Sequence, residues 1–231
     1  MSGEEQITFC DKSIYETGFL TSKKFPPLKN DRILKAIRGE VPDKLPIWIM
    51  RQAGRYLPEF KKIREVPLIG FSGALWTLMG FMVVQKHYLK LKNGFMLKEQ
   101  AHVLLTLLTD VIIDYLVMQV EAGGQILEVF DTRAEYLNKN LYKEYGLPCI
   151  KRICEDVKEK LKILNLKNVP VVLFAKGAWF CLEEQAVLGI DWTVNVEKLQ
   201  RKPNITYQGN LDPCALYAPK ADLEQYIKRY D

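Results

Sequence analysis

The fold of this chain is decided around the stretch Ile47-Trp48-Ile49-Met50-Arg51-Gln52-Ala53-Gly54-Arg55-Tyr56-Leu57-Pro58-Glu59-Phe60. Its first residues, together with Pro46, form an apolar run with β-branched and aromatic side chains, which predicts a buried strand. A small turn follows at Ala53 and Gly54, where the backbone can approach a ligand closely. On either side of this turn, Arg51 and Arg55 present planar donor groups suited to a carboxylate or phosphate. The spacing fits an anion-binding turn, and it equally fits a solvated loop.

Apolar segments typical of strands alternate with helical segments along the rest of the chain. This alternation predicts a parallel sheet covered by helices. The order of segments does not by itself separate a closed barrel from an open, doubly wound sheet. The predicted strands are 46–50, 67–71, 125–130, 170–174, 187–192 and 205–207; the predicted helices are 32–38, 57–65, 76–83, 98–121, 137–164 with an interruption at Pro148, and 220–229.

Polar side chains follow the predicted strands, where parallel α/β folds build their ligand sites. Other roles are open for several of these residues. Asp131 and Asp191 are equally suited to cap helices, and Lys176 can pair with Glu183 or Glu184. Aromatic residues nearby are more typical of a core than of a ligand wall. The polar residues are Arg51, Ser72, Asp131, Lys176, Asp191 and Asn210, and the aromatic residues are Trp76, Phe81 and Trp192.

The composition is that of a globular protein with one core. Of the 231 residues, 48% are hydrophobic and 26% are charged. The net charge of +5 mildly favours anionic small molecules, and the basic residues are too dispersed for a nucleic-acid interface. The five cysteines are too scattered for a disulfide framework, and no Cys/His spacing matches a zinc site. We therefore expect reduced thiols and no metal.

Two segments bear on localisation. Residues 1–24 form a polar leader without an apolar core of signal length, so we expect a cytoplasmic protein. Residues 101–120 are the most hydrophobic stretch, but Asp110 and Asp114 lie near its middle. Acidic side chains are costly at bilayer depth, so this stretch predicts a packed helix and not a membrane span.

Four stretches resemble the uroporphyrinogen decarboxylase family of haem biosynthesis: MRQAGRYLPEF (50–60), VPLIGFSGALWTLM (66–79), LGIDWTV (188–194) and QGNLDPCALYA (208–218). The family removes CO2 from the acetate side chains of uroporphyrinogen to give coproporphyrinogen. The resemblance implies one (β/α)8 TIM-barrel domain over residues 25–231. It also implies an incomplete barrel with about six of eight strands. We expect an internal deletion at residues 64–66 and a truncation at Asp231.

The resemblance also implies the site residues. Two positions differ from the family pattern: Phe81 replaces a tyrosine and lacks its hydroxyl, whereas Thr132 replaces a serine and keeps one. The family's pocket aspartate and C-terminal histidine fall in the segments expected to be missing, and its usual Lys-Asp-Gly reads Lys176-Gly177-Ala178. The implied catalytic residues are Arg51 and Arg55, and the implied substrate-binding residues are Arg51, Gln52, Ala53, Gly54, Arg55, Phe81 and Thr132.

The implied chemistry needs no metal or organic cofactor. Protonation of a pyrrole ring carbon creates an iminium-like sink for the electrons that CO2 leaves behind. The site must therefore bind an anionic tetrapyrrole, supply a proton and stabilise a cationic ring; the resemblance also implies a homodimer. One alternative is a non-catalytic fragment or degenerate paralogue that retains part of the substrate clamp or dimer surface. Another, disfavoured by the lack of a paired His/Cys site, is a related barrel methyltransferase that uses zinc and a corrinoid.

Overall fold

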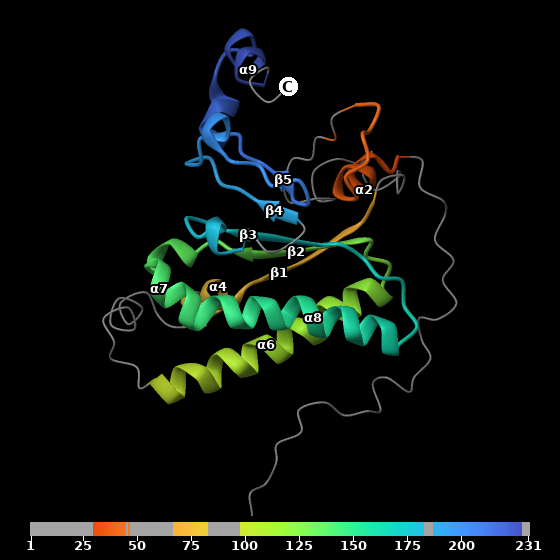
Figure 1. Ribbon diagram of the computed structural model, residues 1–231, viewed down its shortest axis with the longest axis vertical. Helices are drawn as coiled ribbons and strands as arrows, with labels where there is room; N and C mark the ends of the chain where they lie inside the picture. The colour runs from red at the N-terminus through yellow and green to blue at the C-terminus, as the bar shows by residue number, and fades with distance from the viewer. Residues whose placement is uncertain (1–29, 45, 47–66, 83–97, 183–186, 228–231) are drawn as a thin grey trace, which may run out of the picture.

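The computed structural model describes residues 30–44, 46, 67–82, 98–182 and 187–227 (Figure 1). Within these ranges five parallel strands form one sheet in the order β1-β2-β3-β4-β5. Each strand lies beside the next one along the chain without a reversal, which is the winding of a (β/α)8 barrel and not of a doubly wound sheet. The fold is thus an incomplete barrel-type α/β fold. The strands are β1 Ile69–Gly73, β2 Ile126–Asp131, β3 Val171–Ala175, β4 Val187–Gly189 and β5 Thr206–Gln208.

The helices follow the predicted pattern closely, and α6 has the predicted bounds. The predicted interruption at Pro148 is wrong, because the break comes earlier, in a π-helical turn at Tyr142–Gly146. Pro148 itself lies two residues after this turn, at the start of α8. The helices are α2 Arg32–Ile37, α4 Leu75–Met82, α6 Lys98–Glu121, α7 Lys139–Leu141, α8 Leu147–Ile163 and α9 Lys220–Ile227.

Two strand predictions have other outcomes. The strand predicted at 46–50 lies outside the described residues except for Pro46, as does the whole helix predicted at 57–65. Strand β4 ends at Gly189, three residues before the predicted end. The reason is that Asp191 turns to accept hydrogen bonds from the backbone N–H groups of Gly177 and Thr193.

The outer face of the sheet carries the main core. Helices α6 and α8 lie along this face (Figure 1). Leu127 and Val129 of β2 point into this core because side chains alternate between the faces of a strand. Their partners include Leu116 of α6 and Ile153 of α8, both fully buried. Burial of such side chains stabilises the fold by roughly 1.5–3 kcal/mol each.

Helix α6 is the packed helix that the sequence predicts. Residues 101–121 have a mean hydropathy of 1.9, so by length and composition alone they could cross a membrane. The helix packs against β1 and α8, and both of its central aspartates form ion pairs with α8, Asp110 with Arg152 and Asp114 with Lys160. A row of apolar side chains remains exposed on its far side: Val103, Leu107, Val111, Tyr115 and Met118.

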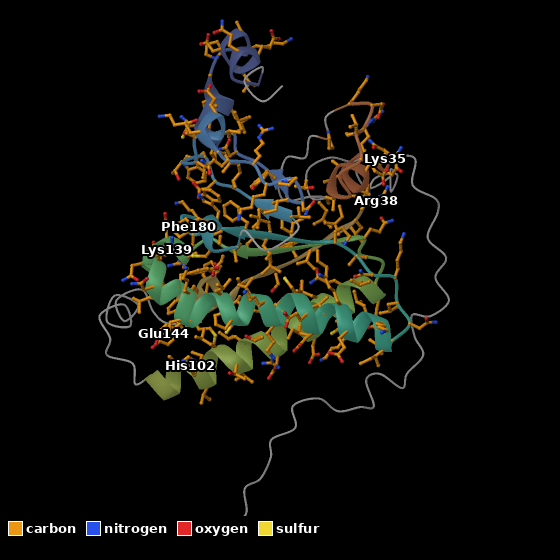
Figure 2. All side chains as sticks on the ribbon, viewed as in Figure 1. Lys35, Arg38, His102, Lys139, Glu144 and Phe180 are labelled. Atoms are coloured by element: carbon orange, nitrogen blue, oxygen red, sulfur yellow. The ribbon has the colours of Figure 1, made fainter. Side chains whose placement is uncertain are left out.

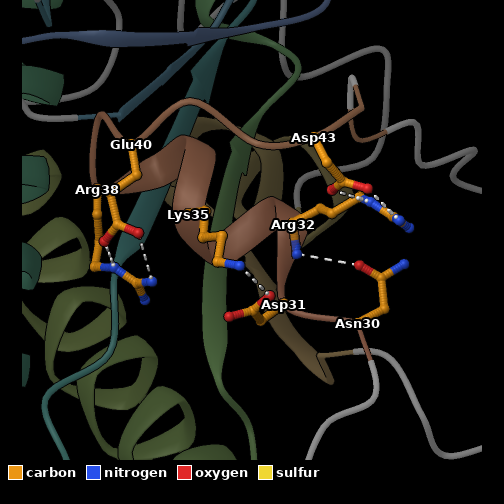
Figure 3. A network of polar contacts seen from close by, with 7 residues as sticks. All are labelled: Asn30, Asp31, Arg32, Lys35, Arg38, Glu40 and Asp43. Atoms are coloured by element: carbon orange, nitrogen blue, oxygen red, sulfur yellow. Dashed lines mark hydrogen bonds and ion pairs between the residues drawn. The ribbon is translucent and has the colours of Figure 1, made fainter.

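Helix α2 covers the N-terminal end of the inner face. Its apolar side packs against Ile69, Ile126, Val172 and Val187. Its other side carries a polar network of ion pairs (Figure 3). Asn30 accepts a hydrogen bond from the backbone N–H of Arg32 at the start of the helix, and the helix ends before Gly39, at φ +75°. The pairs are Arg32–Asp43 (2.6 Å), Lys35–Asp31 (3.2 Å) and Arg38–Glu40 (2.5 Å).

Candidate functional site

The described polar residues gather at the C-terminal edge of the sheet, as predicted. Because all five strands are parallel, the residues that end or follow each strand reach the same edge. Phe81 and Thr132 belong to this edge, on α4 and directly after β2. The predicted anion-binding turn, Arg51, Gln52, Ala53, Gly54 and Arg55, lies outside the described residues and stays a prediction. The gathered residues are Ser72, Asp131, Lys176, Asp191 and Asn210.

Asp131 holds the start of α4 against the end of β2. One carboxylate oxygen accepts hydrogen bonds from both the backbone N–H and the hydroxyl of Thr77, each at 3.2 Å. A side-chain oxygen that accepts a hydrogen bond from a first-turn N–H is the arrangement of a helix cap. The Thr77 hydroxyl also shares a hydrogen bond of 3.2 Å with Thr132. Asp131 is therefore a helix cap, and it fixes Thr132 beside α4.

Asp131 is also a titratable group in a buried place. Burial raises the pKa of Asp131 to about 7, against the opposing effect of the hydrogen bonds from Thr77. Its second oxygen and the hydroxyl of Tyr142 are both buried without a hydrogen-bond partner in the described structure. Burial, and next the charge of Asp131, hold the pKa of Tyr142 well above its usual value. This carboxyl group therefore titrates near neutral pH.

Arg133 lies between two aromatic rings at the same edge. Its guanidinium carbon is 5.2 Å from the centroid of the Phe81 ring and 6.0 Å from that of Tyr136. Phe81 is 72% exposed, so a core role for this residue is wrong. It stands one helical turn after Thr77, which directs it to the loop that follows β2. The position implied to contact substrate is thus exposed and lies beside a cation.

Lys176, which follows β3, is a second cation at this edge. Its ammonium group pairs with Glu135 at 2.9 Å and lies 4.9 Å from the centroid of the Trp192 ring. The predicted partners Glu183 and Glu184 lie outside the described residues. Trp192 is 42% exposed, so it is not the core aromatic that its type suggests, whereas Trp76 is buried in the core.

Asp191 and Asn210 join the loops that follow β4 and β5. Burial opposes ionisation of Asp191, but hydrogen bonds from Thr193 and Gly177 outweigh it and hold its pKa below the usual value. The side-chain amide of Asn210 donates to the backbone oxygens of Asp191 (2.9 Å) and Val194 (2.6 Å). A pocket of about 310 Å³ lies beside them, lined by residues 192–197 and Asn210. Like Asp131, Asp191 mainly binds backbone groups.

The inner face below this edge is aromatic and holds one carboxyl group. Phe71, Phe130 and Phe174 stand edge to face in a row across β1, β2 and β3, with centroids 6.2 and 6.1 Å apart. Glu128 lies two residues before Phe130 in β2 and therefore on the same face of the sheet. It is buried, and burial raises its pKa to about 7. Neither Glu128 nor Arg133 is predicted as a site residue from the sequence. An acid inside an apolar strand was the available signal for Glu128.

Other features of the described residues lie apart from this edge. A larger cavity, of about 910 Å³, opens at the opposite edge, between α2 and the loops that enter β2 and β3, and no predicted site residue lines it. Within the described ranges no group of three His, Cys, Asp or Glu side chains could hold a metal ion. Among the described residues, the cysteines at 149, 154, 181 and 214 form no disulfide bond with one another.

A parallel sheet of sequential strand order, with charged and polar residues at its C-terminal edge, places the protein among the barrel-type α/β folds. The sequence profile described as "Uroporphyrinogen decarboxylase (URO-D)" matches residues 28–66 and 61–230. The chain belongs to the uroporphyrinogen decarboxylase family. The two matched parts meet at residues 61–66, where the sequence analysis expects an internal deletion.

Curated uroporphyrinogen decarboxylases align with nearly the whole chain. The Schizosaccharomyces pombe protein is 30% identical over 315 positions, covering 88% of each chain. The Homo sapiens protein is 31% identical over 322 positions, covering 93% of this chain and 88% of the human one. The Danio rerio protein is 30% identical, covering 91% and 86%. Because these alignments span more positions than the chain has residues, the relatives contain residues that this chain lacks.

Proposed function

We propose that this protein decarboxylates the acetate side chains of uroporphyrinogen without a metal or organic cofactor. The proposal is carried by family membership across residues 28–230. It is supported by two cations at the C-terminal edge of the sheet: Arg133, which lies beside Phe81, and Lys176, which contacts Trp192 and pairs with Glu135. A multiply anionic tetrapyrrole is the kind of substrate that such an edge attracts.

In the proposed reaction, Arg51 and Arg55 bind substrate carboxylates, and Thr132 donates a hydrogen bond to another. A proton adds to the pyrrole α-carbon next to the ring carbon that bears the acetate arm, which leaves an iminium conjugated with that arm. The bond to the carboxylate then breaks, CO2 leaves, and its electron pair neutralises the iminium. A proton taken up at the exocyclic carbon and one lost from the ring leave a methyl group. Preorganised charges typically contribute 10²–10³ in rate to such steps.

A second candidate function is tetrapyrrole binding without catalysis. Two observations favour it: the two family matches meet at residues 61–66, and Phe81 lacks the hydroxyl of the family's tyrosine. In this role the protein is a degenerate paralogue that keeps part of the clamp. We further propose a cytoplasmic homodimer, for which the exposed apolar row of α6 offers a contact surface.

Anaerobic incubation with uroporphyrinogen, followed by oxidation and chromatography of the porphyrins, separates the two candidates. The decarboxylase converts uroporphyrinogen to coproporphyrinogen, and Arg51→Gln and Arg55→Gln each lower kcat/KM by about tenfold or more. Arg201→Gln is the matched control, because Arg201 is exposed in the segment that leads into β5, away from the C-terminal edge. Substrate binding without any less-carboxylated product would favour the second candidate.

A further inference from the structure

Strand β1 has a lateral edge, the side away from β2, to which no other strand of the described residues is bonded. The backbone oxygen of Leu68 accepts a hydrogen bond from the N–H of Gln125, at the start of β2. At the other end of β1, the N–H of Ala74 donates to the backbone oxygen of Phe130. Successive residues of a strand turn their backbone groups to opposite sides. Phe71 lies an odd number of residues from both Leu68 and Ala74, so its N–H and C=O point to the lateral edge.

Gln119 of α6 occupies these two backbone groups in the way that a neighbouring strand would. Its side-chain oxygen accepts a hydrogen bond from the Phe71 N–H (2.7 Å), and its side-chain nitrogen donates to the Phe71 oxygen (3.1 Å). The same nitrogen donates to the backbone oxygen of Tyr115 (3.3 Å), one turn earlier in the helix. Both N–H groups of the amide are thus used, which fixes its orientation.

Gly70 makes room for this contact. A Cβ atom at Gly70 would lie 2.8 Å from the side-chain oxygen of Gln119 and 3.1 Å from its Cβ atom, too close for the first pair of atoms. Helix α6 packs along β1, and Tyr115 and Met118, which neighbour Gln119 on the helix, are half-exposed. Phe71 is half-exposed as well. Within the described part of the chain, one side chain therefore covers the centre of the lateral edge, in a place that a glycine leaves for it.

We propose that the lateral edge of β1 is a strand-pairing surface that Gln119 keeps closed, and that its partner when open is the same edge of a second copy. The edge is self-complementary, because two copies placed antiparallel about Phe71 can exchange both backbone hydrogen bonds of this residue. An open strand edge is a template for such pairing. By satisfying the same donor and acceptor within one chain, Gln119 stops the sheet from extending into another molecule. The inference is independent of catalysis and of the side-chain contact proposed for the apolar row of α6.

Size-exclusion chromatography with light scattering tests the proposal by measuring the molar mass of the full chain over a range of concentrations. Gln119→Leu is expected to raise the mass by about twofold or more over the wild type, because it leaves the backbone groups of Phe71 open to a second copy. Gln125→Leu is the matched control. Its amide oxygen accepts a hydrogen bond from the N–H of Leu68 (3.1 Å), on the β2 side of the strand, so this variant keeps the wild-type mass.

A second substitution distinguishes strand pairing from a general exposure of apolar surface. Phe71→Pro removes the N–H that a partner strand needs, and proline is tolerated in an edge strand where its nitrogen faces outward. Added to Gln119→Leu, it should restore the wild-type mass. The inference is overturned if Gln119→Leu keeps the wild-type mass or if the double variant stays larger. Circular dichroism melts identify variants that do not fold; Gln119→Ala and Phe71→Lys, which puts a charge on the edge, then replace them and are judged by the same two results.

Discussion

The two faces of the sheet are built for different purposes. The outer face is closed by α6 and α8, and side chains fill the space between these helices and the sheet (Figure 2). Its strand residues Leu127 and Val129 are fully buried. Among the described residues, α2 covers the N-terminal end of the inner face, and above it lie a row of phenylalanines and the carboxyl group of Glu128. Phe71 on this face is 55% exposed. The outer face thus supplies stability, whereas the inner face and its C-terminal edge supply the surface that a ligand can reach.

The largest expected effect on the free energy of unfolding is a difference between a buried and an exposed leucine of α6. Leu116→Ala should lower the free energy of unfolding by about 3 kcal/mol, because it leaves a cavity in the outer core. Leu107→Ala is the matched control and should cost less than about 1 kcal/mol, since this leucine is 49% exposed. Urea denaturation measures both. Equal costs would show that the exposed row of α6 is covered in solution.

The second largest effect on stability is expected at Asp131, the last residue of β2. Its pKa is raised from 3.8, the ordinary value for an aspartate, to about 7 in the folded protein. The stability that this group contributes is therefore complete below about pH 4 and is lost as the pH rises to 7. Asp131→Asn removes that loss and retains an acceptor for Thr77. We expect the variant to be about 1–3 kcal/mol more stable than the wild type at pH 8. Urea denaturation at pH 5 and pH 8 should show the gain growing with pH; a constant difference would contradict it.

A smaller effect of the same sign is expected for Glu128 on the inner face. Its pKa rises from 4.5 to about 7, a smaller change, so the stability it contributes is lost between about pH 4.5 and 7. Glu128→Gln should gain about 1–2 kcal/mol at pH 8 and little at pH 4. Chemical denaturation across this pH range measures it. A loss at pH 8 would mean that the ionised carboxylate has a stabilising partner.

The smallest expected effect concerns the ion pairs that join α6 to α8. Arg152→Gln removes the half-exposed contacts with Asp110 and Asp156 and should cost under about 1 kcal/mol. The cost should shrink further in high salt because exposed charges are screened. Melting curves at low and high salt measure it. A salt-independent cost would instead point to lost packing of the arginine stem.

Much of the fold follows from local sequence. Strand and helix positions were predictable because apolar runs such as those of β2 and β3 are continuous and are bounded by turn residues. The bounds of α6 were predictable because Gly123 and Gly124 follow a long apolar pattern. The position of the π-helical turn before α8 was not predictable, because Pro148 is a strong local signal for an interruption, whereas the residues of the turn itself carry no such signal.

The site was only partly predictable. The strand-end rule found Asp131, Asp191 and Asn210, but it could not say that they mainly bind backbone groups. That depends on partners far along the chain; Thr77 and Asp131 are 54 residues apart. Arg133 and Tyr136 gave no signal, because an arginine and a tyrosine in a loop are usually solvated.

The sequence by itself determined the parallel sheet, the family and the positions of the strand ends, because these depend on the order of apolar and polar residues along one segment. Only the tertiary structure decided which face each strand residue occupies, which carboxyl groups are buried enough to titrate near neutral pH, and which rings receive Arg133. These properties depend on the packing of distant segments, and burial and contact with such segments set the charge state and orientation of a side chain.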